Sequence, residues 1–389
     1  MKNYLLSLTL FFTLFSFAQT NLAYEAVDKK VALIPQKSTT STQEIAKYID
    51  ANFTTENEKI RAIFYWTASN ISYDVANMFA VNFEETTKDR IAKTLKTHKG
   101  ICADYAAIFN EIANSVGIKS VVISGYTKQN GKIADLSHAW CAAKIDNKWY
   151  VFDPTWGSGS LTNGKFVKKI NNYYFKTEPS KIISSHIPFD YLWQFSNYPV
   201  TNDEFYAGKT QINKTKKYFD FEKEQRKQSS LSEIDQLFES AERIEKNGLK
   251  NAMIVAYYEN QKKHSAFLRQ NVSIEKLNKI VAEMNEAVVL LNDFIFYRNN
   301  KFKPTFPDEE INSMIQKPKE KLIKCQNDIY KVGAIGTDSA NLSSIKKSIE
   351  SNLALAEEQA LFVKNYLSKS KLIRKTMFSK VSWMGIPLN

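Results

Sequence analysis

In the first half of the chain, hydrophobic residues recur at helical spacing before they alternate at strand spacing. A helix is expected to begin after Thr55, a candidate N-cap whose capping-box partner is Glu58. A second helix is expected from residue 102, because one apolar stripe runs along residues 105–116 and Gly117 supplies a common helix end. Two helices are therefore predicted ahead of the strands.

The stretch that follows alternates between hydrophobic and polar residues, as strands do. Residues 118–126, 137–145 and 148–153 are predicted to be strands, with turns at Asn130-Gly131 and at Asp146-Asn147. Helices followed by an antiparallel sheet are typical of the α+β class. The first half therefore predicts an α+β core.

The turn at Asp146-Asn147 determines which side chains share a face of the sheet. A two-residue turn pairs Trp140 with Asp153, and alternation then places His138 on the same face. His138 and Asp153 become diagonal neighbours within side-chain reach. Cys141 faces the other way, as a small core residue. A three-residue turn would reverse this parity.

The second half is dominated by helical spacing and contains few Pro and Gly residues. A capping-box pattern at 230–233 begins one apolar stripe, which ends at Asn247-Gly248. Pro304 and Pro307 mark a break, and another helix is expected from about 345 to 372. Between Gly248 and Pro304 lies a predicted seam of hydrophobic residues that step by four and three: Leu277, Val281, Met284, Val288, Leu291 and Ile295. These patterns predict an all-α helical bundle. The same spacing suits a dimerising coiled coil, so the oligomeric state stays open.

The N-terminal residues have the organisation of a secretory signal peptide. A positive start precedes a mostly apolar stretch at 4–17, and Ser16-Phe17-Ala18 offers a small-residue cleavage site. The alternative is an uncleaved N-terminal anchor. We expect a signal peptide at 1–18, an N-terminal segment at 19–54, a catalytic domain at 55–215 and a helical bundle domain at 216–389. The protein is then secreted or periplasmic, with no transmembrane span after cleavage.

Composition narrows the function classes only slightly. The 389 residues carry a formal net charge of +12, but the basic residues are scattered and form no groove-reading motif, so no nucleic-acid partner is expected. The chain has three Cys residues. A Cys141–Cys325 disulfide is conceivable, yet no spacing pattern supports it. The Cys and His residues show no metal-ligand spacing and there is no glycine-rich phosphate loop, so neither a metal nor a cofactor is expected.

One ordered set of residues supplies the parts of covalent acyl-transfer chemistry. Cys102 stands at a predicted helix N-terminus, where free N–H groups favour a thiolate, and Gly100 before it would let a substrate approach the backbone. His138 and Asp153 follow as a base and an orienting carboxylate. His98 is the rival base, in a basic loop four residues before the cysteine.

The chain resembles the transglutaminase-like superfamily of cysteine enzymes, in particular its secreted bacterial branch. The matching segments, strongest over 60–160, are Ile63-Phe64-Tyr65-Trp66, Asn70-Ile71-Ser72-Tyr73-Asp74, Gly100-Ile101-Cys102-Ala103-Asp104-Tyr105-Ala106, His138-Ala139-Trp140 and Asp153-Pro154-Thr155-Trp156. A less specific stretch, which reaches about 205 and resembles the tail of the secreted branch, contains Tyr174-Phe175, His186-Ile187-Pro188 and Trp193-Gln194. The resemblance implies a papain-like α+β core with Cys102 as nucleophile, His138 as base and Asp153 as orienter. It also implies an aromatic side chain near the oxyanion site, for which Trp66 is the candidate. Trp140 is a further candidate for substrate binding.

The sequence thus predicts an exported cysteine enzyme that acts on protein or peptide substrates by acyl transfer or by hydrolysis. Transfer and hydrolysis share every step up to the acyl-enzyme, so the sequence does not separate them. The alternative is a non-catalytic envelope protein that uses the same fold as a binding scaffold.

Overall fold

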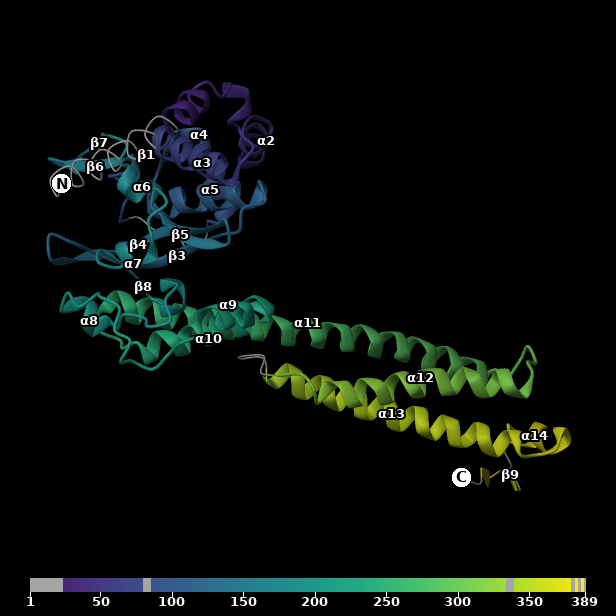
Figure 1. Ribbon diagram of the computed structural model, residues 1–389. Helices are drawn as coiled ribbons and strands as arrows, with labels where there is room; N and C mark the ends of the chain where they lie inside the picture. The colour runs from purple at the N-terminus through teal and green to yellow at the C-terminus, as the bar shows by residue number, and fades with distance from the viewer. Residues whose placement is uncertain (1–23, 80–84, 334–338, 379–381, 384–385, 388–389) are drawn as a thin grey trace, which may run out of the picture. The chain divides into compact units, whose positions relative to one another are not determined.

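The computed structural model describes residues 24–79, 85–333, 339–378, 382–383 and 386–387 (Figure 1). The chain divides into two compact units, residues 1–262 and residues 263–389. The predicted signal peptide at 1–18 lies outside the described residues. The boundary expected at 215/216 remains a prediction about domains, and residues 216–262 belong to the first compact unit.

The first unit combines short helices with one central antiparallel sheet. A helical segment at 24–31 precedes the named helices. These are α2 (Thr42–Asn52), α3 (Glu56–Asn70), α4 (Thr87–Thr97), α5 (Cys102–Ser115), α6 (Pro154–Ser158), α7 (Pro179–Ile182), α8 (Asn202–Tyr206), α9 (Phe221–Ser230) and α10 (Glu233–Lys246), with single 3₁₀ turns η1 (Gln36–Ser38), η2 (Asn172–Tyr174) and η3 (Tyr191–Gln194). The strands are β1 (Ser72–Tyr73), β2 (Lys99–Gly100), β3 (Ser120–Gln129), β4 (Lys132–Ile145), β5 (Lys148–Phe152), β6 (Gly159–Thr162), β7 (Lys165–Lys168) and β8 (His186–Pro188).

The helix starts follow the capping rules that the sequence suggested. The Thr55 hydroxyl accepts from the backbone N–H of Glu58 and the Glu58 carboxylate accepts from that of Thr55, so the predicted capping box of α3 is confirmed. Helix α10 begins later than expected. Its N-cap is Ser232, which accepts from the N–H of Asp235, and Ser230 instead closes α9.

The central sheet has the strand order β5-β4-β3-β8, and each neighbouring pair is antiparallel. Asp146 and Asn147 adopt left-handed backbone angles of φ 50° and 62°, the geometry of a two-residue hairpin turn. Ile145 pairs with Lys148 across this turn, so the predicted register of β4 and β5 is confirmed. The predicted turn at Asn130-Gly131 likewise joins β3 to β4.

Helices α2, α3 and α5 cover one face of this sheet and bury the main core of the unit (Figure 1). The β4 side chains that enter this core are those predicted to face away from His138: Ala139, Cys141, Ala143 and Ile145. The opposite face is covered by later segments, through two smaller clusters that include Trp140 and Tyr126. The site residues on β4 therefore lie between two packed layers.

A buried arginine ties the beginning of the chain to this core. Arg61 on α3 is 2% exposed and donates to both carboxylate oxygens of Asp28, at 2.7 and 2.6 Å, and to Asn172 Oδ1 at 2.7 Å. Its guanidinium lies over the rings of Tyr24 and Phe175, 4.7 and 4.8 Å from their centroids. A buried cation requires such partners, so segments near 28 and 172 are fixed around one side chain.

Helix α10 is anchored to the sheet-bearing part of the first unit. Arg243 donates from Nε and Nη2 to the two carboxylate oxygens of Asp190, at 2.8 Å each, and from Nη2 to Gln228 at 3.0 Å. Ile244 and Ile254 are fully buried in the cluster that contains Tyr126 of β3. The helical segments just beyond residue 216 thus complete the packing of the first unit.

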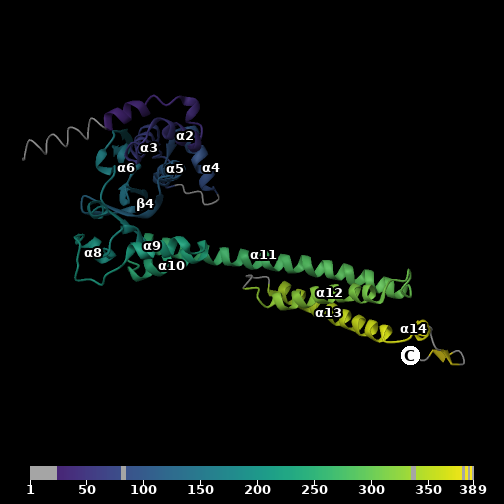
Figure 2. The same cartoon turned by 45° about the vertical axis from the view of Figure 1, so that its right-hand side comes forward.

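The second unit is helical. It contains most of the 48-residue helix α11 (Ala252–Asn299), followed by α12 (Asp308–Ile329), α13 (Ser339–Leu367), α14 (Lys371–Thr376), β9 (Ser382–Trp383) and β10 (Ile386–Pro387). Helices α12 and α13 run side by side in both views (Figure 2). Lys321 and Lys324 on α12 form ion pairs with Glu286 and Glu283 on α11. The predicted helical C-terminal region is confirmed, and it also contains the two short strands β9 and β10. Helix α12, which carries Pro318 in its interior, was not predicted from the sequence.

The buried seam of α11 is shifted in phase from the predicted one. Its buried residues are Leu277, Ile280, Met284, Ala287, Leu291 and Phe294, which step by three and four. The predicted members Val288 and Ile295 are only partly buried against this cluster. The prediction failed at Ala287 because a small residue gives little hydrophobic signal, although its size allows close helix approach.

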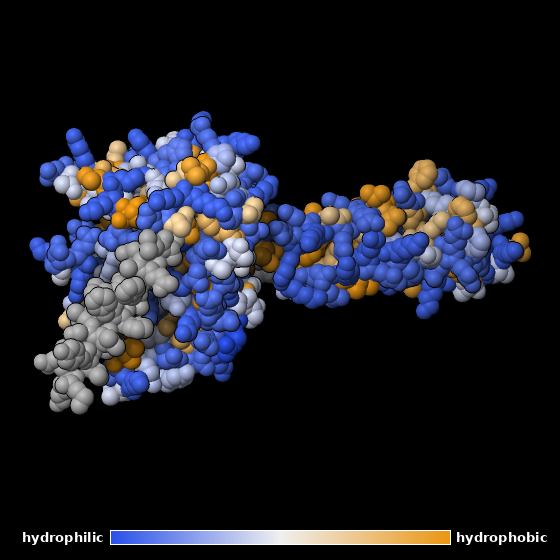
Figure 3. Space-filling view, turned by 45° about the horizontal axis from the view of Figure 1, so that its top comes forward, coloured by the Kyte–Doolittle hydropathy of each residue, from blue (hydrophilic) through white to orange (hydrophobic). Residues whose placement is uncertain are grey.

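The surface drawn in Figure 3 is largely hydrophilic, with hydrophobic patches along the helical unit. Individual exposed apolar side chains there include Phe267, Val289 and Phe296. Among the described residues, no helix combines the length and hydrophobicity needed to cross a bilayer. Cys102, Cys141 and Cys325 are unpaired thiols, so the conceivable disulfide between Cys141 and Cys325 is not formed.

Candidate functional site

Cys102 is the first residue of helix α5, as predicted. Asp104 secures this helix start, because its Oδ2 accepts from the N–H of Ile101 at 2.8 Å and its Oδ1 binds Arg90 at 2.7 Å. The N–H groups of a first helical turn have no partner within the helix and present partial positive charge. The half-buried Cys102 thiol therefore stands where an anion is stabilised.

Gly100 immediately precedes this turn, in the short strand β2. A Cβ at this position would lie 2.8 Å from the Cβ of Asp104 and 3.1 Å from Thr94 Cγ2. Close packing against the Asp104 side chain accounts for the glycine. Its predicted contact with substrate remains a prediction.

His138 and Asp153 lie together as the strand register required. His138 Nε2 lies 2.8 Å from Asp153 Oδ2, and both side chains are buried. Asp153 also caps α6, since its Oδ1 accepts from the N–H groups of Thr155 and Trp156 at 2.9 and 3.0 Å. The predicted shared face is confirmed, and Pro154 at the first helical position favours the turn that holds the carboxylate.

The other nitrogen of the His138 ring faces Cys102. The thiol is hydrogen-bonded to the His138 side chain and to the backbone N–H of Ala139. Cys102, His138 and Asp153 thus form a continuous chain of contacts from α5 through β4 to the end of β5. The structure brings together the three residues that the sequence singled out.

The electrostatic interactions among these three residues favour a charged pair, Cys102 and His138. Burial opposes ionisation of Cys102, but the hydrogen bond and positive charge of His138 outweigh it and lower the pKa of the thiol. Burial also opposes protonation of His138, yet the Asp153 carboxylate raises its pKa to about 10. Burial disfavours ionisation of Asp153, and His138 reverses this effect and lowers the pKa of the carboxyl. The arrangement stabilises a thiolate beside an imidazolium.

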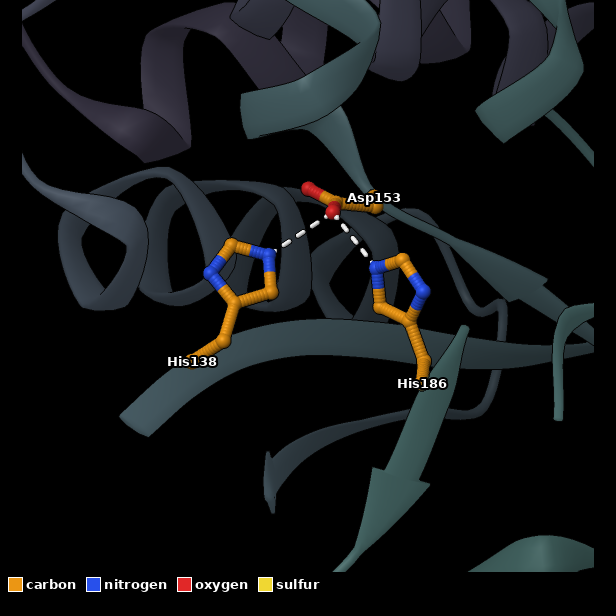
Figure 4. Close-up of side chains that lie close together, drawn as sticks. All are labelled: His138, Asp153 and His186. Atoms are coloured by element: carbon orange, nitrogen blue, oxygen red, sulfur yellow. Dashed lines mark hydrogen bonds and ion pairs between the residues drawn. The ribbon is translucent and has the colours of Figure 1, made fainter. Parts of the chain in front are cut away.

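His186 on β8 is a site residue that sequence reasoning missed. Its Nε2 lies 3.1 Å from Asp153 Oδ2, so two imidazoles share one carboxylate oxygen, as Figure 4 shows. The side chain is 1% exposed. Nothing around residue 186 in the sequence signals this partner, because β8 reaches the site through long-range pairing with β3. Burial lowers the pKa of His186 despite the neighbouring carboxylate.

These three side chains are also the residues that could hold a metal ion. One ligand atom each from His138, Asp153 and His186 lies within 4.8 Å of the others. The Nε2···Oδ2 separations of 2.8 and 3.1 Å are ordinary hydrogen-bond lengths. Two N–H donors on one carboxylate therefore account for the arrangement without an ion.

The remaining predicted residues have different surroundings. Trp66 is 1% exposed within the main core, and its role near the oxyanion site remains a prediction. Trp140 is equally buried and stacks on His138 at a centroid distance of 5.9 Å, which makes it a support for the imidazole. The rival base His98 is exposed and terminates α4 in a left-handed conformation.

Tyr73 is an aromatic residue in the surroundings of Cys102. It pairs with Gly100 in the β1–β2 register, two residues from Cys102, and is half-buried. Burial, and next the negative charge of Cys102, raise the pKa of its hydroxyl to about 12. Tyr73 therefore keeps its O–H proton beside the thiolate and can donate a hydrogen bond.

Cys141 points away from this constellation. It is fully buried in the main core, and its Sγ donates to the backbone carbonyl of Ala106 at 3.2 Å. Burial raises the pKa of this thiol well above its ordinary value. The prediction that Cys141 is a packing residue is confirmed.

Comparison with known proteins identifies relatives of this region. A family profile described as the transglutaminase-like superfamily matches residues 43–154. Kyphoscoliosis peptidase from Mus musculus is 29% identical over 47% of this chain and 28% of its own length. Cytokinesis protein 3 from Saccharomyces cerevisiae is 26% identical over 36% of this chain and 16% of its own.

A solved structure described as that of a TGase is 20% identical, covers 41% of this chain and 38% of its own, and has a TM-score of 0.25. The chain spans less than a third of the length of the two curated relatives. The helical unit from residue 263 lies outside the matched family profile.

Proposed function

We propose, since residues 43–154 belong to the transglutaminase-like superfamily, that this chain is an exported cysteine enzyme acting on carboxamide or peptide bonds of protein or peptide substrates. One observation carries the proposal. A thiol at a helix N-terminus contacts an imidazole whose far nitrogen is 2.8 Å from a buried carboxylate. Nucleophile, base and orienter in that order are the apparatus of acyl transfer.

In the proposed reaction, the Cys102 thiolate attacks the carbonyl carbon and a C–S bond forms. The C–N bond then breaks, and the His138 imidazolium gives its Cys102-facing proton to the departing amine nitrogen. His138 next removes a proton from water or from an acceptor amine, which attacks the thioester and releases Cys102. Water yields hydrolysis and an amine yields a new amide, so both outcomes use the same residues.

Two donors are proposed for the oxyanion of the tetrahedral intermediate. The backbone N–H of Cys102 lies in the first turn of α5 and has no acceptor within the helix. The Tyr73 hydroxyl, protonated and close to the thiolate, is the second donor and takes the role first assigned to Trp66. Donors of this kind contribute about 3–4 kcal/mol each to transition-state stabilisation.

The test is turnover of a glutamine-containing peptide by the full chain, with and without an added primary amine, followed by mass spectrometry. Deamidated, cleaved and amine-linked products all differ in mass, so one measurement distinguishes them. Cys102→Ala should abolish every product, whereas the matched variant Cys141→Ala should retain them. Full activity of Cys102→Ala, with its fold verified by circular dichroism, would contradict the proposal.

A non-catalytic binding role is the competing function. One relative is named as a cytokinesis protein, and its name specifies no enzyme activity. Labelling with iodoacetamide near neutral pH separates the two. Selective alkylation of Cys102 that is lost in His138→Ala supports the enzyme, and a Cys102 that is unreactive in the folded chain supports the scaffold.

Export is proposed from the positive start and the apolar stretch at 4–17. Cell fractionation and N-terminal sequencing of the mature protein test it directly. A secreted or periplasmic protein beginning at Gln19 is expected. A cytoplasmic protein with an intact N-terminus would overturn this part without affecting the chemistry.

A further inference from the structure

We infer that His186 is a positioning residue, a neutral second donor that holds the Asp153 carboxylate charged and directed at His138. The inference rests on the proposed function of Cys102, His138 and Asp153. Asp153 is fully buried and receives four N–H groups, two backbone donors on Oδ1 and two imidazoles on Oδ2. A buried carboxylate is stable as an anion only with such donors, and His186 supplies one of them.

The hydrogen bonds of His186 identify its protonation state. An ionised Asp153 carboxylate only accepts hydrogen bonds, so the His186 Nε2 that lies 3.1 Å from Oδ2 carries the ring proton. Burial lowers the pKa of His186, so the ring carries this one proton. Nδ1, 2.8 Å from the Ser185 hydroxyl, therefore accepts from that hydroxyl, which also lies 3.2 Å from the carbonyl of Ile182. A second proton would place two imidazolium rings 5.6 Å apart in a buried site.

Aromatic rings enclose His186 and keep its orientation. Trp156 lies at a centroid distance of 4.6 Å, Trp140 at 5.1 Å and Tyr174 at 6.0 Å. The titratable groups that face it are Asp153, His138 and the Tyr174 hydroxyl, whose pKa burial raises to about 12. Tyr174 is uncharged at neutral pH, so Asp153 and His138 are the charges to which His186 responds.

The backbone is shaped to let β8 approach this closely. Gly125 on β3 pairs with His138 on one side and Pro188 on the other. A Cβ at Gly125 would overlap the carbonyl oxygen of Ile187 and the indole of Trp140. The glycine therefore leaves room for the strand that carries His186 beside the strand that carries His138.

Two crossed substitutions separate hydrogen bonding from packing. His186→Phe keeps an aromatic ring among the tryptophans but removes the N–H, whereas His186→Gln keeps an N–H donor but removes the ring. The readout is the pH dependence of Cys102 alkylation by iodoacetamide in the full chain, followed by mass spectrometry. The groups that set this profile are His138 on β4, Asp153 at the N-cap of α6 and Tyr73 on β1.

His186→Phe leaves Asp153 with one donor fewer, so its charge supports the His138 imidazolium less well and the thiolate loses stabilisation. The midpoint of the alkylation profile should move to higher pH by about one unit, with a tenfold slower reaction at pH 6. Any peptide turnover should lose kcat with KM unchanged. His186→Gln should keep the wild-type midpoint.

The opposite pattern, a wild-type profile in His186→Phe and a shifted one in His186→Gln, would show that the ring matters only for packing and would overturn the inference. Unchanged profiles in both variants would also overturn it. If His186→Phe does not fold, Ser185→Ala replaces it, since it removes the hydroxyl that fixes the tautomer and should shift the midpoint in the same direction. An unshifted Ser185→Ala then counts against the inference.

The wild-type profile distinguishes this failure from failure of the proposed function. A wild-type Cys102 that alkylates like an unperturbed thiol contradicts the thiolate–imidazolium pair itself. A depressed wild-type midpoint that no His186 or Ser185 variant alters leaves the pair intact and removes only the role of His186.

Discussion

At the scale of single residues, Asp153 organises the site because its two oxygens serve different neighbours. Oδ1 is held by the backbone of α6, which fixes the carboxylate plane, and Oδ2 then faces both imidazoles. The His138–Asp153 pair was predictable because the two-residue turn that pairs their strands is a local rule, and Cys102 was joined to them by the resemblance to the transglutaminase-like superfamily. His186 was not predictable, because its partner is 33 residues away and no local pattern connects them.

The pH dependence of Cys102 reactivity depends on His138. Alkylation requires the thiolate, and the lowered pKa of Cys102 keeps thiolate present below the ordinary range of a thiol. His138→Ala removes a hydrogen bond and a positive charge, so the midpoint should rise and alkylation at pH 6 should slow at least about tenfold. The midpoint is measured from the rates of iodoacetamide labelling between about pH 5 and 10, because ordinary His and Cys side chains titrate in roughly this range.

The exposed His98 provides the control for that measurement. His98→Ala changes a histidine four residues before Cys102 without touching the chain of contacts, and its profile should match the wild type. A slowed His98→Ala with an unaffected His138→Ala would reverse the assignment of the base.

The proposed oxyanion donor gives a second residue-scale prediction. Tyr73→Phe removes one hydroxyl beside the thiolate, so kcat should fall by about a hundredfold or more while KM stays nearly constant. Tyr173→Phe, at an exposed tyrosine, should have wild-type kinetics. Steady-state turnover of the glutamine peptide measures both. An undiminished kcat in Tyr73→Phe would show that Tyr73 is not an oxyanion donor and would leave only backbone N–H groups in that role.

At the scale of elements, features that depend on neighbouring residues were predicted correctly, whereas features that depend on long-range contacts were missed. The hairpin of β4 and β5 was predictable in register because its turn lies within two residues. Strand β8 has three residues, and its place beside β3 depends on a glycine at 125 that meets it only in three dimensions. The seam of α11 was misphased at Ala287, whose burial is set by the opposing helices rather than by its own hydrophobicity.

The capping box of α3 gives the element-scale prediction. Thr55→Ala removes the hydroxyl that accepts from the N–H of Glu58, so the free energy of unfolding should fall by about 1 kcal/mol. Thr54→Ala is the matched control, because Thr54 contributes only its backbone N–H to Glu58 and should change stability little. Urea denaturation followed by circular dichroism compares the two, and equal effects would contradict the capping argument.

At the scale of the whole molecule, the change in sequence character near residue 216 does not coincide with the division at 262/263. The sequence pattern assigned helices α9 and α10 to the helical half, because the spacing of hydrophobic residues does not show what a helix packs against. Their partners, Asp190 and the cluster around Tyr126, lie in the sheet-bearing part of the first unit. Hence fold class was predictable, whereas the extent of the first unit required tertiary contacts.

The Arg243–Asp190 pair tests this extent. Arg243→Met leaves the Asp190 carboxylate buried without its cation, and breaking such a pair costs about 3–5 kcal/mol of unfolding free energy. Lys227→Met, which breaks a more exposed ion pair between Lys227 on α9 and Glu239 on α10, should cost no more than about 1 kcal/mol. Chemical denaturation followed by tryptophan fluorescence measures both. Similar small losses would mean that α10 packs only loosely on the first unit.

During synthesis from the N-terminus, the partners of Arg61 become available at different times. Asp28 is available as soon as α3 forms, but Asn172 and the ring of Phe175 arrive more than a hundred residues later. Before Asn172 and Phe175 are present, the guanidinium lacks some of its partners, and burying it would be unfavourable. The family profile matches residues 43–154, but Arg61 takes partners on both sides of that range. We therefore expect the smallest piece that folds on its own to begin before Asp28 and to extend past Phe175.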